Sequence, residues 1–214
     1  MLRLKVPGMS QDPFEQPVST KGRPRAPLRG RVVWLTGLPA AGKTTLAVAL
    51  ERELGAGGRP VLRLDGDELR RGLCADLGFS VTDRAENIRR AAEAAKRSAD
   101  AGQDCVVALI SPLRVDRARA RAIVGSARFI EVNVATPVEI CRQRDPKGLY
   151  ARAERGEIAD FTGVSAPYEA PESPEVRVQA GRDTVTTCVT QVIDYLAGRP
   201  GSPARSSAAR SPRT

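Results

Sequence analysis

The stretch that decides the fold is VVWLTGLPAAGKTT, residues 32–45. It opens with an apolar run, VVWLTG at 32–37, which predicts a buried strand, and it closes on a pattern that predicts a helix from about Lys43 to Leu54. Between them, GLPAAGKT matches G-x-x-x-x-G-K-[ST]. A strand before this motif and a helix after it predict a phosphate-binding loop.

The glycines of such a loop let backbone N–H groups turn inward around a phosphate, and the helix N-terminus adds positive partial charge. Lys43 is expected to reach the β and γ phosphate oxygens, and the Thr44 hydroxyl is expected to hold Mg²⁺. The residues predicted to bind ATP are Gly37, Leu38, Pro39, Ala40, Ala41, Gly42, Lys43, Thr44 and Thr45.

Strand and helix patterns alternate outward from this loop. Further strands are expected at 61–65, 105–110 and 129–134, and helices near 67–73, from Asp83 onward, and at 114–124, 137–144 and 184–196. The long helix carries a buried stripe of Ile88, Ala91, Ala92, Ala95 and Ala99. The pattern predicts an α/β, P-loop NTPase-type three-layer sandwich over residues 31–196, in which helices cover both faces of a parallel sheet.

The composition is globular, with 41% hydrophobic and 28% charged residues in 214, and no apolar run is long enough for a membrane span. The net charge of +9 is concentrated at the ends: 1–30 and 197–214 carry +4 each, which leaves +1 for the body. Both ends are rich in Pro, Gly and Ser, so disordered basic tails are expected. Solvated ends without a partner are the favoured interpretation, and weak polyanion contact is the alternative.

The chain has no histidine, which excludes Ser-His-Asp and Cys-His hydrolases and leaves proton transfer to carboxylates or other groups. Its cysteines form no C-x-x-C pair and are expected to be buried thiols, with no zinc site: Cys74, Cys105, Cys141 and Cys188. The first 20 residues contain no apolar h-region, so a reducing cytoplasm is the expected compartment.

Asp65-Gly66-Asp67 follows the second predicted strand, which is expected to lie beside the phosphate-loop strand. One or both carboxylates could then face the γ-phosphate, where they would accept a hydroxyl proton or orient Mg²⁺. A turn and helix cap is the alternative interpretation of the same three residues.

Several further blocks resemble the adenylylsulfate kinases, in order and at family-like spacing. They are GLPAAGKTT (37–45), LDGDELRRGL (64–73), DLGFSVTDRAENIRR (76–90), ISPLRVDRARAR (110–121), RDPKGLYARA (144–153) and FTGVSAPYEAPESPE (161–175). The resemblance implies transfer of the ATP γ-phosphoryl group to the 3′-hydroxyl of adenosine 5′-phosphosulfate, in sulfate activation. The products would be 3′-phosphoadenosine 5′-phosphosulfate and ADP, and Mg²⁺ would be required.

The resemblance also implies an acceptor site. Arg70, Arg84 and Asn87 would bind the phosphosulfate and ribose, and Arg84 and Asn87 are three apart, hence on one helical face. A solvated helix face is the alternative for any single arginine. Phe79 and Phe161 would sandwich the acceptor adenine, with core packing as the alternative.

Ile110 and Ser111 would contact the substrate, and a lid formed by Lys147, Gly148 and Leu149 would close over it. A plain loop lysine is the alternative for Lys147. The implied catalytic residues are Lys43, Asp65, Asp67 and Lys147, the implied metal ligands are Thr44 and Asp65, and Asp67 also belongs to the acceptor site. The sequence departs from the family at Pro39, Ala40, Glu68, Arg71 and Leu113.

Two alternatives stay open. The chain could be a kinase for another nucleotide or small alcohol, or a nucleotide-binding regulator or basic nucleic-acid adaptor that has lost turnover. The favoured reading expects no membrane and no specific nucleic acid as partner. It also expects a homodimer, and a separate ATP sulfurylase that supplies the substrate.

Overall fold

The computed structural model describes residues 30–199 as a five-stranded parallel sheet in the order β2-β3-β1-β4-β5. The strands are β1 (Val32–Thr36), β2 (Val61–Asp65), β3 (Asp104–Ala108), β4 (Phe129–Val134) and β5 (Val176–Val178). The helices are α1 (Lys43–Ala56), α2 (Gly66–Arg71), α3 (Val81–Asp100), α4 (Arg114–Val124), α5 (Val138–Arg144), α6 (Leu149–Glu154) and α7 (Val185–Leu196).

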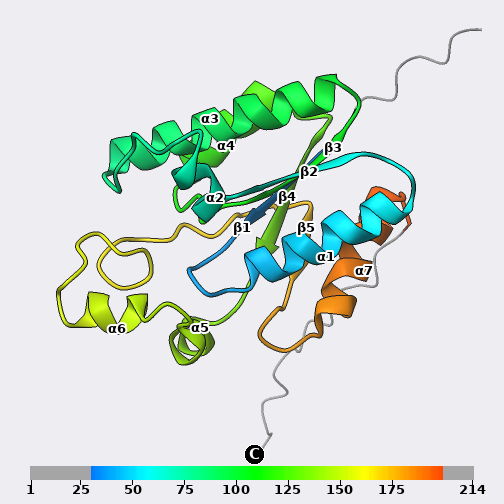
Figure 1. Cartoon of the computed structure of the whole chain (residues 1–214). Helices are drawn as coiled ribbons and strands as arrows, with labels where there is room; N and C mark the ends of the chain where they lie inside the picture. The colour runs from blue at the N-terminus through cyan, green and yellow to red at the C-terminus, as the bar shows by residue number, and fades with distance from the viewer. Residues whose placement is uncertain (1–29, 200–214) are drawn as a thin grey trace, which may run out of the picture.

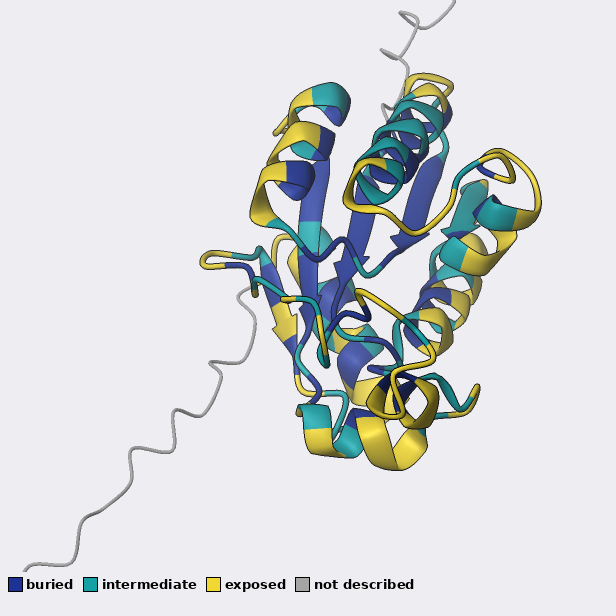
Figure 2. Ribbon diagram, turned by 90° about the vertical axis from the view of Figure 1, so that its left-hand side faces the viewer, coloured by how far each residue is buried: buried dark blue, intermediate teal, exposed yellow. Residues whose placement is uncertain are grey.

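Helices cover both faces of the sheet, as predicted. Figure 1 shows α2, α3 and α4 on one face, and α1 and α7 on the other. The central strand β1 is buried at every position, and its side chains alternate: Val33 and Leu35 join the core under α1 and α7, whereas Val32 and Trp34 join the core under α3 and α4. Burial falls from the strands outward to the helix surfaces (Figure 2).

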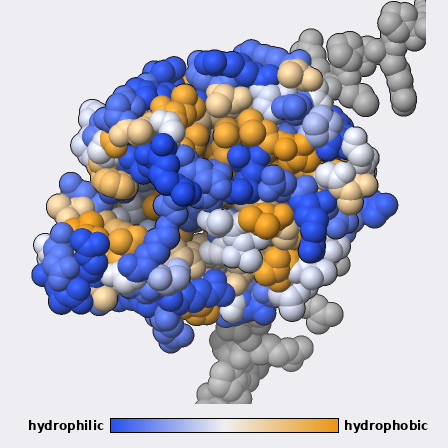
Figure 3. All heavy atoms as spheres, in the orientation of Figure 1, coloured by the Kyte–Doolittle hydropathy of each residue, from blue (hydrophilic) through white to orange (hydrophobic). Residues whose placement is uncertain are grey.

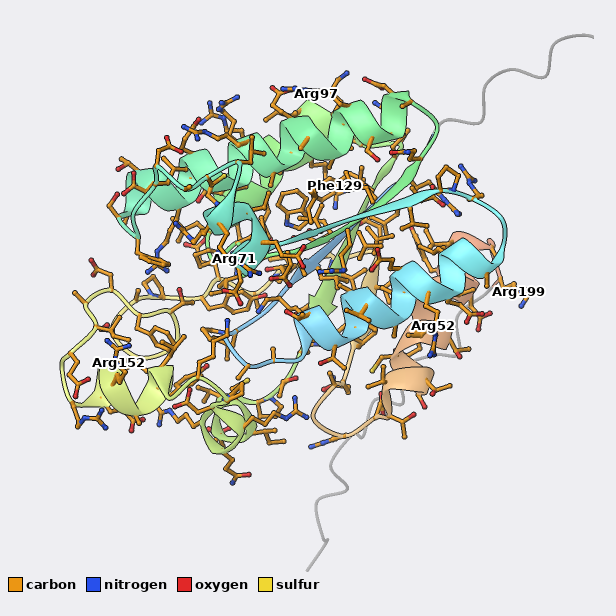
Figure 4. The ribbon with its side chains drawn as sticks, in the orientation of Figure 1. Arg52, Arg71, Arg97, Phe129, Arg152 and Arg199 are labelled. Atoms are coloured by element: carbon orange, nitrogen blue, oxygen red, sulfur yellow. The ribbon has the colours of Figure 1, made fainter. Side chains whose placement is uncertain are left out.

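The predicted stripe of α3 is confirmed, because Ile88, Ala91, Ala92, Ala95 and Ala99 are all buried. These small side chains leave room for larger rings on the sheet. Phe129 points into the layer between the sheet and α3 (Figure 4), where it stacks on Trp34 with ring centroids 5.4 Å apart.

The prediction that β2 lies beside β1 is wrong. β3 lies between them, and its Val107 pairs with Trp34 of β1 on one side and with Leu64 of β2 on the other. Sequence patterns give strands but not their order in the sheet. The helix α6 and the three-residue strand β5 were not predicted either.

The described residues contain no helix long and apolar enough to cross a membrane. All four cysteines are free and buried, as predicted. The predicted basic tails lie outside the described residues, apart from their innermost positions. The loops after β1, β2 and β3 meet at the carboxyl edge of the parallel sheet, which is where this class of fold binds its ligands.

Candidate active site

The loop between β1 and α1 has the backbone that its glycines predict. A side chain at Gly37 would lie 2.7 Å from the carbonyl oxygen of Val134, so only glycine fits there. Gly42 has φ 101°, which glycine adopts without strain. Ala40 has φ 58°, a left-handed conformation that is costly for a residue with a Cβ atom.

The N-terminus of α1 is arranged for an anion. No side chain caps the helix, and its first turn contains no acidic residue. The first N–H groups of a helix have no partner within the helix, and they carry the positive end of its dipole. The loop therefore leaves its N–H donors to a phosphate group.

Lys43 is held inside the loop that precedes it. Its ammonium donates hydrogen bonds to the carbonyl oxygens of Gly37, at 3.0 Å, and Leu38, at 2.7 Å. Burial lowers the pKa of Lys43 to about 8, against the smaller opposing effect of Asp65 and Asp67. A polyphosphate would favour the charged ammonium, so this position suits an anionic ligand.

Thr44, in the first turn of α1, meets the end of β2 directly, although β3 lies between β1 and β2 in the sheet. The Thr44 hydroxyl donates to Asp65 Oδ2 at 2.7 Å, and Asp65 Oδ1 accepts from the backbone N–H of Asp67 at 3.0 Å. Asp65 thus caps α2 as well as facing the phosphate loop, and both interpretations of the turn hold.

The donor set at Thr44 and Asp65 fits Mg²⁺. A hydroxyl and a carboxylate are hard oxygen ligands, and Mg²⁺ in such sites takes its other ligands from water and phosphate. The described residues form no group of three or more His, Cys, Asp or Glu side chains that could hold a metal unaided. A magnesium ion here would therefore arrive with the nucleotide.

The predicted lid lysine contacts the predicted base. Lys147 forms an ion pair with Asp67, and both side chains are more than half exposed. Gly148 follows with φ 63° as the N-cap of α6, so the segment predicted to form the lid is a turn followed by a short helix. Figure 3, in the orientation of Figure 1, shows a recess on the surface between the positions of α2 and α6.

Arg70 and Phe79 form one unit at the acceptor side. The Arg70 guanidinium lies 4.1 Å from the centre of the Phe79 ring, and it donates to the carbonyl oxygens of Leu77 and Gly78. Phe79 is 65% exposed, so core packing is not its role. An exposed ring held by a cation is available for stacking.

Arg84 joins the two segments that carry the predicted stacking rings. Its Nε donates to the carbonyl oxygen of Phe79 at 2.8 Å, and its two terminal nitrogens donate to Thr162 Oγ1 at 2.8 Å and to the carbonyl oxygen of Asp160 at 2.6 Å. Phe161 lies between those last two residues but is only 8% exposed, and it packs edge-on against Tyr150. In this conformation Phe161 belongs to the core, and its stacking role stays a prediction.

Asn87 and Ser111, which are predicted to contact the substrate, are both buried. Asn87 is 4% exposed, and its Nδ2 has no hydrogen-bond partner among the described residues. The Ser111 hydroxyl accepts a hydrogen bond from Trp34 Nε1 at 3.0 Å, and Ile110 beside it is partly buried. The Asn87 amide thus has an unpartnered donor, and the Ser111 hydroxyl, which accepts from Trp34, keeps its own O–H to donate.

The sequence analysis missed two residues that bond to the backbone of the phosphate loop at Ala41. Thr136 donates its hydroxyl to the carbonyl oxygen of Ala41 at 2.8 Å, and Arg144 bonds to the carbonyl oxygens of Ala41, at 3.4 Å, and Ala180, at 2.8 Å. Arg144 lies inside the quoted block RDPKGLYARA, which is the only signal that could have found it.

The sheet order, the phosphate loop after β1 and the carboxylates after β2 define a P-loop kinase. Residues 29–179 match the model of one family of such enzymes, described as Adenylylsulphate kinase. The chain belongs to the adenylylsulfate kinase family.

Its similarity to individual members is high. An adenylyl-sulfate kinase from Shewanella amazonensis is 53% identical over 168 residues, which are 78% of this chain and 85% of that protein. One from Staphylococcus epidermidis is 51% identical over 78% of this chain and 84% of that protein. The structure of the Mycobacterium tuberculosis APS kinase in complex with AMPPNP and APS has a TM-score of 0.77 at 46% identity, covering 80% of this chain and 99% of that one.

Proposed function

We propose that the chain transfers the γ-phosphoryl group of ATP to the 3′-hydroxyl of adenosine 5′-phosphosulfate. The bond between the γ-phosphorus and the β–γ bridging oxygen breaks, and a bond between the γ-phosphorus and O3′ forms. The products are ADP and 3′-phosphoadenosine 5′-phosphosulfate. The observation that carries the proposal is that one turn, Asp65–Asp67, contacts both the phosphate loop at Thr44 and the lid at Lys147.

On the donor side, the residues of the phosphate loop bind the triphosphate through the N–H groups at the start of α1. Lys43 gives up its two carbonyl partners and donates to the β and γ phosphate oxygens. Mg²⁺, held by Thr44 and by Asp65 through water, would neutralise charge that develops on the phosphates.

On the acceptor side, Asp67 accepts the proton of the attacking hydroxyl. This role suits a chain without histidine, and the Asp67 carboxylate is more than half exposed and therefore open to a ligand. Lys147 must leave Asp67 when it turns to the phosphates, so lid closure would free the base at the moment it is needed.

The acceptor itself is bound by stacking and by charge. Phe79, steadied by Arg70, offers a flat face to the adenine, and Phe161 would have to turn out of its packing against Tyr150 to cover the other side. Arg84, next to Phe79, and the unpartnered Nδ2 donor of Asn87 would hold the phosphosulfate and ribose.

We also propose a homodimer in the cytoplasm that receives its substrate from a separate ATP sulfurylase. Four free thiols suit a reducing compartment. Analytical ultracentrifugation of the full chain tests the dimer, and a single monomeric species at micromolar concentration would reject it.

The test is ADP release in a coupled assay, with adenosine 5′-phosphosulfate, adenosine, gluconate or shikimate as acceptor, with and without Mg²⁺. Turnover is expected with the first acceptor alone and only with Mg²⁺. Equal or faster turnover with another acceptor would overturn the proposal.

Two variants test the roles proposed for Lys43 and Asp67. Lys43→Ala should abolish turnover, and Asp67→Asn should lower kcat by about 100-fold to 10,000-fold while nucleotide still binds. Glu53→Gln, which removes one exposed carboxylate from α1, is the matched control and should keep the rate of the unaltered chain. Near-normal rates in either active-site variant would show that the assignment is wrong.

A further inference from the structure

The turn between β3 and α4, residues 110–112, holds a backbone that is strained. Ser111 has φ 44°, a left-handed conformation that L residues other than glycine adopt only at a cost. Such a conformation persists where the surroundings over-determine it. The contacts around Ser111 therefore show what fixes the shape of this turn.

Two side chains supply most of these contacts. Thr36, at the end of β1, donates its hydroxyl to the carbonyl oxygens of Ile110, at 2.7 Å, and Ser111, at 3.4 Å. Arg117, in the first turns of α4, donates from Nη1 to the carbonyl oxygens of Ser111, at 2.7 Å, and Pro112, at 3.2 Å. It is 3% exposed, and its Nε forms a 2.7 Å ion pair with Glu131 of β4. A buried guanidinium in which all three nitrogens have a partner fixes geometry, because each of its donors has one direction.

The same guanidinium holds a second segment in place. Its Nη2 donates to the carbonyl oxygen of Glu169 at 2.7 Å, and the Glu169 N–H donates to the carbonyl oxygen of Pro112 at 2.9 Å. The Glu169 carboxylate accepts from the N–H of Arg114 at 2.7 Å, and so caps α4, which lacks a cap of its own. Tyr168, which precedes Glu169, forms a hydrogen bond through its hydroxyl with the Thr36 hydroxyl at the end of β1.

These contacts differ from those of an ordinary ion pair on the same helix. Arg121, one turn further along α4, also faces Glu131, at 3.5 Å, and it pairs with Glu175 at 2.7 Å. It bonds to Phe129 in the sheet but to neither the 110–112 turn nor the 168–169 segment. Arg121 is thus a matched comparison that shares the charge and the helix but lacks contact with the turn.

We propose that Arg117 is a positioning residue for the acceptor: it holds the 110–112 turn and the 168–169 segment in the one arrangement that binds adenosine 5′-phosphosulfate. The proposal rests on the proposed function, because it assigns the turn to the acceptor rather than to ATP. Arg117 is 3% exposed and its nitrogens bond within the protein, so the proposal gives it no direct contact with either substrate. Loss of Arg117 would act by displacing the carbonyl groups of Ser111 and Pro112, which follow β3. Thr136, which supports the phosphate loop, follows β4, on the other side of β1.

The experiment compares Arg117→Met, Arg117→Lys and Arg121→Met by steady-state kinetics, with each substrate varied in turn and folding checked by thermal melting. Arg117→Met should raise the KM for adenosine 5′-phosphosulfate by at least about tenfold, since a displacement of 1 Å can cost far more. The KM for ATP should change less than about twofold, because the phosphate loop is intact. Arg117→Lys keeps the charge beside Glu131 but cannot reproduce the fork of donors, and should give a rise of about threefold or more in the acceptor KM.

Arg121→Met should leave both KM values within about twofold of those of the unaltered chain. An acceptor KM in Arg117→Lys no higher than in Arg121→Met overturns the positioning role, and so does an equal rise in both KM values. If Arg117→Met does not fold, the lysine variant decides. A lack of any turnover with adenosine 5′-phosphosulfate in the unaltered chain is a different failure, since it removes the proposed function itself.

Discussion

Ala40 offers a direct measurement of strain in the phosphate loop. Its φ of 58° costs about 1–2 kcal/mol for a residue with a Cβ atom. Ala40→Gly removes that cost, but glycine gains freedom in the unfolded chain, which takes back about 0.4–1 kcal/mol. The methyl group is only partly buried, so its loss subtracts about 0.4 kcal/mol, half the value of a fully buried CH₂ group. At the midpoints of these ranges the three contributions sum to about +0.4 kcal/mol, so the variant should be about as stable as the unaltered chain or slightly more stable.

Ala118 provides the matched control, because it is an exposed alanine with ordinary helical geometry within α4. Ala118→Gly makes the same chemical change and gains the same freedom in the unfolded chain, but it relieves no strain. It should lower the free energy of unfolding by about 1 kcal/mol. The two variants should differ by roughly 1–1.5 kcal/mol, with Ala40→Gly the more stable.

Urea unfolding followed by circular dichroism measures this difference, and a thermal scan provides a second reading. In a domain of this size, 1 kcal/mol shifts Tm by about 2–4 °C, so the gap is about 2–6 °C. Equal destabilisation by both variants would refute the reasoning, because it would mean that the left-handed conformation at Ala40 carries no cost.

Two further predictions concern the active site. Burial lowers the pKa of Lys43 to about 8. Because ATP binding requires the charged ammonium, the Kd for ATP should be constant below pH 8. Above pH 8 it should rise about tenfold per pH unit. Isothermal titration calorimetry between pH 7 and 9.5 measures this, and a level Kd across the range would contradict it. Lys147→Met should lower kcat by about 100-fold with little change in the KM for ATP, since it removes a donor used in the transition state. A kcat within about threefold of normal would exclude Lys147 from the chemistry.

The sequence predicted what local patterns encode. The strand 32–37 and the helix from Lys43 were expected within two residues of their observed ends, because an apolar run and a glycine-rich motif mark both boundaries. The Thr44–Asp65 contact followed from placing both residues at the carboxyl edge of a parallel sheet, even though the assumed neighbour relation of β1 and β2 was wrong.

What the sequence could not show depends on contacts between distant segments. The strand β5 has only three residues, VRV at 176–178, too few for a periodic pattern, and it exists because β4 offers it an edge. Arg117 was not singled out from the sequence, and Arg84 was predicted only to bind the acceptor. The contacts of both with segments more than 50 residues further along the chain appear only in the structure. The burial of Phe161 likewise depends on Tyr150, which has no signal of its own.

The capping of α4 by Glu169, 55 residues further along the chain, bears on how the protein is made. A ribosome releases α4 well before it releases the carboxylate that completes this helix. Until then the start of α4 has no cap. The strand β5, the helix α7 that shares a core with α1, and Ala180 behind the phosphate loop all follow Glu169 in the chain, so neither pocket is complete before this last segment has emerged.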